Sequence, residues 1–236
     1  NRVVVATAHD SAYRVALDLA AAGVAVPLIA DVRPVSDGKL PSLARDAGLR
    51  VFNGASIGGT KGRKRLNQVT VVGGGRAETI ACDALLVSGG WTPSIHLYSQ
   101  SRGKPVFDEA WGAFVPGTAM PNQICAGACN GTFDLPDVLA EGVAAGLKAS
   151  SNEAASSRTI AVTGAPAARG SGLVVPDVPP DAAAFVDFQN DVCAKDILLA
   201  VREGMHSIEH VKRYTTTGMA TDQGKTSNLN ALAIVA

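Results

Sequence analysis

The chain has 236 residues, 47% of them hydrophobic, which is enough for one large domain or two small ones with a sizeable buried core. Its 21 lysines and arginines balance its 21 aspartates and glutamates, so no overall charge favours nucleic acid or an anionic membrane. The apolar runs are too short to span a bilayer, no secretory signal precedes the first strand, and four cysteines are too few for a disulfide framework. We therefore expect a cytoplasmic α/β protein, and the start at Asn1 rather than Met suggests a piece of a longer polypeptide.

The first third of the chain alternates strand and helix patterns. Residues 2–7 predict a strand, 11–22 carry helical periodicity that closes at Gly23, and 24–30 predict a second strand that ends at Asp31. This order favours a parallel sheet. A short helix is expected over 40–47, strands are expected over 50–57, 68–72 and 79–82, and a buried strand is expected over 84–88.

The predicted strand–helix–strand unit has only part of a dinucleotide-binding pattern. Asp31 stands where such folds carry the acidic residue that meets the ribose hydroxyls. The turn after the first strand should carry glycines that admit a pyrophosphate, but it carries Ala6, Ala8 and Ser11. Because these side chains would crowd a phosphate, a scaffold without nucleotide is favoured over direct nucleotide binding.

A second stretch, from Gln123 onward, predicts a short strand, a turn of small residues and then a helix. Asp134 is a plausible N-cap, and Pro136 falls in the first helical turn. Such a helix start can hold an anion, although a close-packed helix start without ligand is the alternative. Cys125 and Cys129 have a spacing that is unusual for zinc or redox pairs, so small buried residues are favoured there. Residues 151–183 are rich in Ala, Ser, Gly and Pro and predict a linker.

The order of these pieces resembles the flavoprotein disulfide reductases, in which a second dinucleotide-binding domain is inserted into a first. The turn GGWTP and the stretch AGACNGTFDLPDVLAEGVAAG carry this resemblance, but Ala128 replaces the flavin-binding aspartate of the family. The expected fold is α/β, part of a flavoprotein with two dinucleotide-binding domains, followed by a small helical module. The expected parts are an inserted dinucleotide-binding-like domain (1–104), the C-terminal part of the first, NAD-binding domain (105–150), the linker (151–183) and the helical module (184–236).

Nearly the whole chain is similar to the α-subunit family of heterotetrameric sarcosine oxidases. The stretches VVATAHDSAYRVALDLA, LLVSGGWTPSIHLYSQSRGKP, CAGACNGTFDLPDVLAEG, FVDFQNDVCAKDI and KRYTTTGMATDQGKTSN carry the similarity. The resemblance implies that the first domain binds NAD, with Ala128 permitting close approach and Phe133 and Leu135 supplying apolar contact.

The same resemblance implies an oxidoreductase that demethylates sarcosine to glycine, hydrogen peroxide and a one-carbon unit, formaldehyde or methylenetetrahydrofolate. A β subunit and other subunits of the heterotetramer are the implied partners. The β subunit would carry FAD and also FMN, with the FMN lying against this chain, while tetrahydrofolate would bind in a domain beyond residue 236. No residue of this chain is expected to be catalytic.

The C-terminal module resembles helical [2Fe–2S] modules of the bacterioferritin-associated ferredoxin type. The four ligand positions fall on Asp187, Gln189, Asp222 and Ser227, none of which supplies a thiolate, so we expect no cluster. A pair of histidines, His206 and His210, is expected four residues apart on one helix, as surface residues rather than metal ligands.

A polar loop remains in the module, and its cofactor-facing candidates are Thr216, Thr217, Lys225 and Thr226. Hydroxyls, glycine backbone and a lysine suit a phosphate or a flavin edge, so the loop is predicted to face FMN. The alternative is that the same groups only cap helices. For the whole chain, an electron-transfer subunit of the opine or proline dehydrogenase type and a purely structural scaffold remain alternatives.

Overall fold

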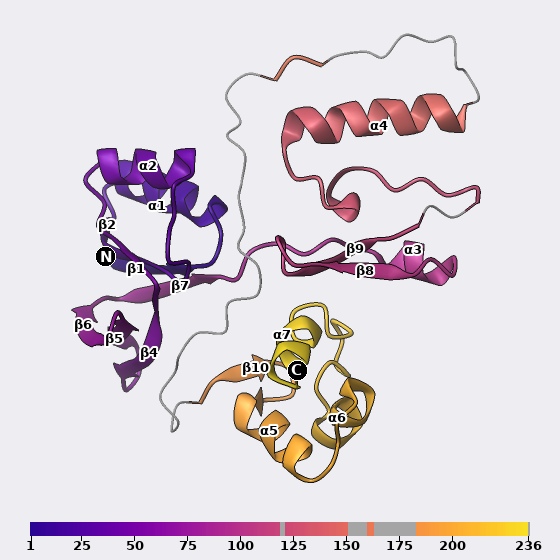
Figure 1. Cartoon of the computed structure of the whole chain (residues 1–236). Helices are drawn as coiled ribbons and strands as arrows, with labels where there is room; N and C mark the ends of the chain where they lie inside the picture. Colours follow the sequence, from indigo (N-terminus) through magenta and orange to yellow (C-terminus); the bar gives the residue numbers. More distant parts are fainter. Residues whose placement is uncertain (119–120, 151–159, 163–182, 236) are drawn as a thin grey trace. The chain divides into compact units, whose positions relative to one another are not determined.

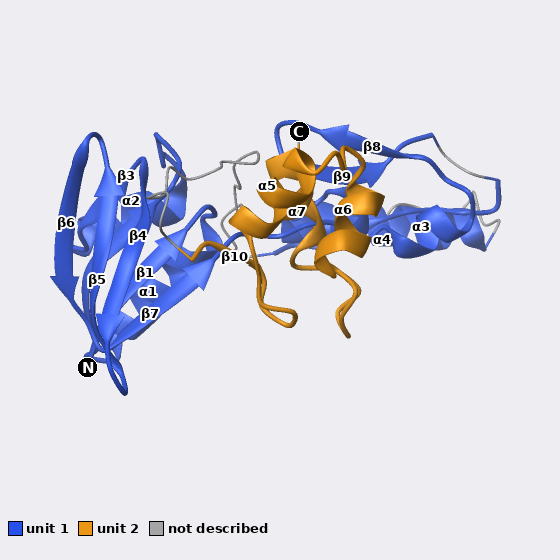
Figure 2. Cartoon of the chain, turned by 90° about the horizontal axis from the view of Figure 1, so that it is seen from below, with its two compact units in different colours: residues 1–176 blue, residues 177–236 orange. Residues whose placement is uncertain are grey.

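The computed structural model describes residues 1–118, 121–150, 160–162 and 183–235. The chain divides into two compact units, residues 1–176 and 177–236 (Figure 2). Apart from 160–162 and Ala183, the predicted linker over 151–183 lies outside the described residues, and the predicted domain boundaries stay predictions.

The first unit begins with a four-stranded parallel sheet of order β3-β2-β1-β7. Its strands are β1 (Arg2–Thr7), β2 (Ala25–Asp31), β3 (Val51–Asn53) and β7 (Ala84–Ser88). Helices α1 (Ser11–Ala21) and α2 (Lys39–Asp46) cover one face (Figure 1). Because successive side chains of a strand point to opposite faces, Val3 and Val5 pack under the helices while Val4 packs on the other side.

A three-stranded antiparallel sheet covers that other side of β1 and β2. Its strands are β4 (Ala55–Gly62), β5 (Leu66–Gly73) and β6 (Arg76–Ala81), and Val69 and Val71 of β5 are fully buried against Val4 and Leu28. Gly74 and Gly75, both at positive φ, close the tight turn between β5 and β6. This part of the unit is therefore three layers thick.

Two expectations for this region need correction. The single strand expected over 50–57 is two strands, β3 and β4, because Gly54 breaks the extended backbone with a φ of 62°. The strand expected to be buried over 84–88 exists, but Val87 is 73% exposed. The reason is the strand order, in which β7 is at the edge of the sheet and, among the described strands, pairs with β1 alone.

The rest of the first unit holds α3 (His96–Gln100), the antiparallel hairpin β8 (Pro105–Asp108) and β9 (Ala113–Pro116), the 3-10 turn η1 (Gly127–Asn130) and α4 (Leu135–Ala149). The hydroxyl of the buried Tyr98 of α3 lies 2.8 Å from the Thr118 carbonyl and 3.2 Å from the Lys104 carbonyl, both at the open end of the hairpin, and shares its proton between them. The short strand expected from Gln123 does not form, since no described strand pairs with this segment.

The second unit consists of a small hairpin, β10 (Phe185–Asp187) and β11 (Val192–Cys193), and three helices, α5 (Ala194–Arg202), α6 (Ile208–Thr215) and α7 (Asn228–Val235). Its core is separate and apolar, with Val186, Ile197, Val211 and Ala231 buried. The segment that was expected to place His206 and His210 on one helix is divided between α5 and α6, because Gly204 ends the first at φ 94° and Ser207 is the N-cap of the second.

No helix in the described part of the chain has both the length and the apolar character needed to cross a membrane.

Candidate functional site

The predicted NAD-binding turn lies between β9 and α4. Its 3-10 turn starts at Gly127, with φ 71°, and Gly131, with φ 83°, follows its end. Glu141 of α4 reaches back to this turn, where its carboxylate accepts hydrogen bonds from the Gly127 N–H at 2.7 Å and from the Thr132 hydroxyl. The Thr132 hydrogen bond is the largest of the effects that lower the pKa of Glu141. An ionised carboxylate therefore fixes the shape of the turn.

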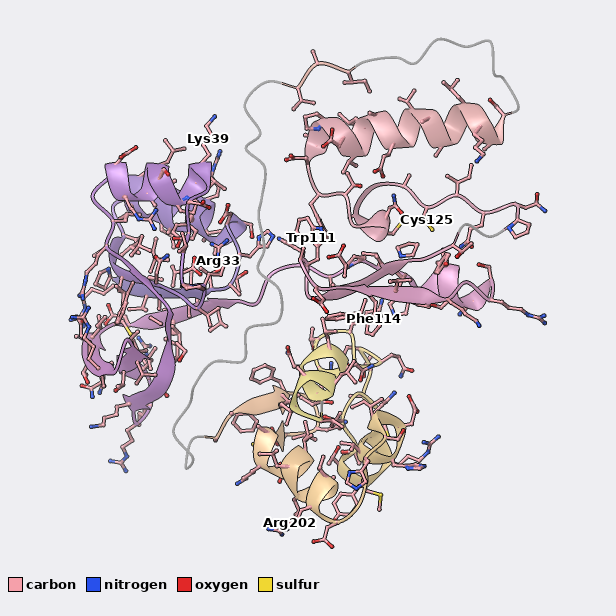
Figure 3. All side chains as sticks on the ribbon, in the orientation of Figure 1. Arg33, Lys39, Trp111, Phe114, Cys125 and Arg202 are labelled. Carbon is pink, nitrogen blue, oxygen red and sulfur yellow. The ribbon has the colours of Figure 1, made fainter. Side chains whose placement is uncertain are left out.

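The three predicted NAD-contacting residues lie around this turn. Ala128 is exposed within it, and Leu135 is exposed at the first position of α4. Phe133 is half-buried and packs on Trp111, with ring centroids 4.9 Å apart (Trp111 is marked in Figure 3). The turn thus presents a small side chain and two apolar ones beside a helix start.

The start of α4 has mixed electrostatics. Asp134 is the N-cap, as predicted, but its carboxylate makes no capping hydrogen bond, and Pro136 falls in the first turn. The positive end of the helix favours an anion, while the carboxylates of Asp134 and Asp137 oppose one. The N–H groups of Gly127, Gly131 and Thr132 already donate to Glu141 and to carbonyls of the turn, so a pyrophosphate would have to be held by other N–H groups of the turn. The small side chain of Ala128 leaves room for such an approach. The residues present fit a dinucleotide on these grounds.

The two cysteines at this turn are free, and so are Cys82 and Cys193. Cys125 (Figure 3) lines a cavity of about 170 Å³ together with Tyr98, Gln123 and Lys148. Burial raises the pKa of the Cys125 thiol, and Cys129 adds to that effect. The thiol form is therefore favoured at neutral pH. Cys125 and Cys129 are only half-buried, whereas buried positions were expected for them. Cys82 and Cys193 are the buried cysteines.

In the second unit, the structure brings together in one loop region the four positions that align with cluster ligands, Asp187, Gln189, Asp222 and Ser227. The buried Asp187 accepts hydrogen bonds from the N–H groups of Gln189, Asn190 and Gly218, the last at 2.8 Å. The Gln189 side chain accepts one from the Thr221 N–H, and Asp222 binds the N–H groups of Gly224 and Thr226. Oxygen acceptors thus tie the β10–β11 turn to the loop over 216–227.

The described residues contain no group of three or more His, Cys, Asp or Glu side chains placed to hold a metal ion. His206 and His210 do not share a helix, since His206 precedes the start of α6. Ser227 is buried, and its hydroxyl has no hydrogen-bond partner among the described residues.

The four predicted flavin-contacting residues differ in their positions. Thr216 is exposed and ends α6 in the left-handed region with φ 64°, and Lys225 is exposed. Thr226 is exposed, but its hydroxyl donates to Asp222 at 2.9 Å. Thr217 is fully buried, so its side chain does not lie on the surface of this unit. Of the four residues, Thr216 and Lys225 are therefore the most accessible on the surface of this unit.

A third polar cluster, at the carboxyl ends of β1 and β2, contains residues that the sequence did not single out. Asp31 is buried and binds Tyr13 and Arg33, and Arg33 also pairs with Asp10 at 2.8 Å. The sequence had indicated this cluster only through Asp31 and the glycine-free turn after the first strand, which together form part of a dinucleotide-binding pattern. Nothing in the sequence showed that Arg33 would be buried there.

Known proteins of one family are similar in sequence to this chain. Residues 181–236 match the family model of the sarcosine oxidase A3 domain. The chain is 41% identical over 233 residues to the sarcosine oxidase subunit alpha of Rhizobium meliloti (strain 1021), covering 98% of this chain and 23% of that protein. It is 36% identical over 253 residues to the same subunit of Corynebacterium sp. (strain P-1), covering 100% of this chain and 26% of that protein.

Solved structures show the fold. The L-proline dehydrogenase from P. horikoshii superposes with a TM-score of 0.65 at 18% identity, covering 99% of this chain and 44% of that one. The T. acidophilum thioredoxin reductase superposes with a TM-score of 0.52 at 16% identity, covering 65% of this chain and 53% of that one. The predicted disulfide-reductase-like fold is thereby confirmed.

This fold, the matched A3 domain and the identity along the whole chain lead to one conclusion: the chain belongs to the sarcosine oxidase α-subunit family, and it spans about a quarter of the length of the curated relatives it matches.

Proposed function

We propose that this chain works as part of the α subunit of a cytoplasmic enzyme that oxidatively demethylates sarcosine. The products would be glycine, hydrogen peroxide and a one-carbon unit, either formaldehyde or methylenetetrahydrofolate. The observation that carries the proposal is the 41% identity to a sarcosine oxidase subunit alpha over 98% of this chain. A β subunit with FAD and FMN, further subunits and a tetrahydrofolate site outside this chain complete the proposed assembly.

The activity is tested on the full-length protein co-expressed with its partner subunits. Sarcosine should give stoichiometric hydrogen peroxide, and tetrahydrofolate should lower the yield of free formaldehyde. A purified, flavin-containing complex that releases no peroxide with sarcosine or other N-methyl amino acids would overturn the proposal.

Within this assembly the chain is proposed to bind NAD at the turn before α4. Ala128 would let the pyrophosphate approach the backbone, while Phe133 and Leu135 would contact the apolar parts of the cofactor. Exposure of Ala128 and Leu135 beside a turn held rigid by Glu141 supports this assignment. The purely structural alternative predicts no NAD at all.

A pair of matched substitutions separates these two readings. Ala128→Leu should reduce the NAD released from the denatured complex, because the larger side chain blocks close approach. Ala144→Leu, on the exposed face of the same helix, is the control and should leave NAD content unchanged. Equal NAD content in both variants would remove the turn from the proposed site.

The second unit is proposed to face the FMN of the β subunit through the loop that contains Thr216, Thr217, Lys225 and Thr226. A bound flavin supplies electron transfer, and the residues of this chain would only hold its edge or phosphate. The exposed Lys225 takes part in none of the ion pairs found among the described residues, so its charge is available to an anion. Thr217 would contribute through its backbone carbonyl, because its side chain is buried and its N–H donates to Thr215 Oγ1.

Lys225→Ala should lower the FMN retained by the purified complex, whereas Lys195→Ala, an exposed lysine on α5, should not. Iron analysis of the same samples addresses the electron-transfer alternative. That alternative needs thiolate ligands, but Asp187, Gln189 and Asp222 use oxygen atoms to bind backbone N–H groups.

A further inference from the structure

Folds of this class usually bind a dinucleotide at the carboxyl ends of the first two parallel strands. In this chain that place is formed by the end of β1, the start of α1 and the end of β2. We propose that it is a self-closed nucleotide site, in which the Arg33 guanidinium and the Asp10 carboxylate occupy the space of a dinucleotide and hold the unit together without one.

Both carboxylate oxygens of Asp31, at the place where a ribose would bind, already accept hydrogen bonds from protein groups. Asp31 is fully buried, and its Oδ1 accepts hydrogen bonds from the backbone N–H and the Nε of Arg33, both at 3.0 Å. Its Oδ2 accepts from Arg33 Nη2 at 2.7 Å and from the Tyr13 hydroxyl at 2.6 Å. A ribose could bind this carboxylate only by displacing buried, charge-assisted partners.

The phosphate end carries a negative charge of its own. Asp10 is the N-cap of α1, its side chain is 1% exposed, and its Oδ1 lies 2.8 Å from Arg33 Nη1. A Cβ at Gly38 would collide with this carboxylate, so the loop before α2 packs directly on it. The Asp10 carboxylate makes no capping hydrogen bond to the helix, but its negative charge close to the helix start repels a second anion there.

The backbone donors of the turn are also used internally. The His9 N–H donates to Thr7 Oγ1 at 3.0 Å, and the Ser11 N–H donates to His9 Nδ1 at 3.2 Å. The Ala8 N–H bonds to the Ser88 carbonyl of β7, and the Tyr13 N–H bonds to the Asp10 carbonyl. The N–H groups that cradle a pyrophosphate in a glycine-rich turn are therefore bound within the protein itself.

Arg33 is the residue on which this closure depends. Its side chain is 7% exposed and forms ion pairs with the buried carboxylates of both Asp10 and Asp31 (Arg33 is labelled in Figure 3). This internal replacement of the ligand does not depend on the proposed function, because it concerns a different site from the turn before α4.

The direct test is hydrogen exchange of the complete enzyme complex, followed by mass spectrometry, with and without millimolar NAD⁺, NADH, NADPH or ADP-ribose. Residues 6–13 and 29–38 should show the same exchange in every sample. Slower exchange of these two segments with any of the four ligands would overturn the proposal, even if other segments also respond.

A second test addresses the holding role of Arg33. Arg33→Met should speed exchange of the β1 and β2 amides by about a hundredfold or more, since two buried carboxylates lose their partner. Arg14→Met, which removes an exposed arginine of α1, should leave exchange of these strands unchanged. Unchanged exchange in Arg33→Met would show that the ion pairs of Arg33 do not stabilise β1 and β2. The ligand test on the unmodified complex decides the proposal if Arg33→Met does not fold.

Discussion

At the scale of single residues, His9 makes the first unit sensitive to acid. Its Nδ1 accepts the Ser11 N–H, so the proton of the neutral ring is on Nε2, and burial lowers its pKa from 6.5 although Asp10 acts in the opposite direction. As the pH falls below 6.5, the unfolded chain binds a proton that the folded chain resists, and the free energy of unfolding decreases.

We expect the protection of the β1 amides, which is their exchange corrected for the intrinsic pH dependence, to fall more between pH 7.5 and 5.5 in the unmodified protein than in His9→Gln. His96→Gln, at an exposed histidine, should behave like the unmodified protein. An identical acid response in His9→Gln would contradict the assignment.

Glu141 is a second residue whose ionised form stabilises local structure, here the turn over 127–132. Glu141→Gln keeps the size of the side chain but removes one acceptor oxygen and the charge, so the turn over 127–132 should lose about 1 kcal/mol of local stability. Because the pKa of Glu141 is lowered, its contribution is present above the ordinary carboxyl pKa and is lost as the pH falls through the lowered one. Faster amide exchange in the turn is the measurement, and Asp137→Asn, in the first turn of the same helix, is the control.

At the scale of elements, Asp187 joins the β10–β11 hairpin to the loop after α6. Asp187→Ala would leave the buried N–H of Gly218 without its acceptor, which costs about 1–3 kcal/mol. We expect faster exchange over 216–227 in this variant and no change in Glu203→Ala, whose side chain is exposed. Equal exchange in the two variants would mean that the Asp187 carboxylate does not hold the loop.

The elements also show how far the sequence could be interpreted. The strand and helix patterns of the first 90 residues were predictable, because alternating buried faces leave a strong periodic signal. The exposure of β7 was not, since it depends on strand order, which no local pattern encodes. The break between α5 and α6 had its signals, Gly204 and Ser207, but the apolar periodicity on either side concealed it.

The candidate sites also contain some features that the sequence predicted and others that it could not predict. The turn before α4 was predictable from its small residues and from Asp134. The Glu141 contact to Gly127 and the bridge from Arg33 to Asp10 were not, because each joins residues 14 or more positions apart through folded backbone. The burial of Thr217 likewise follows from the packing of the second unit and not from its own sequence neighbours.

At the scale of the whole molecule, the two units have separate hydrophobic cores, so their stabilities should be independent. Leu28 is fully buried between the layers of the first unit, and Ile197 is fully buried among the helices of the second. Truncating either side chain to alanine removes buried apolar contacts and leaves a cavity, at a cost of about 2–5 kcal/mol.

Leu28→Ala should therefore raise exchange in β1, β2 and β5 while α5 and α6 keep their protection, and Ile197→Ala should do the reverse. Both are measured in one hydrogen-exchange experiment on the full-length protein, and the double variant should show the sum of the two effects. Loss of protection in both units from either single variant would mean that the enzyme unfolds them as one cooperative body, and that contacts beyond the two cores couple them.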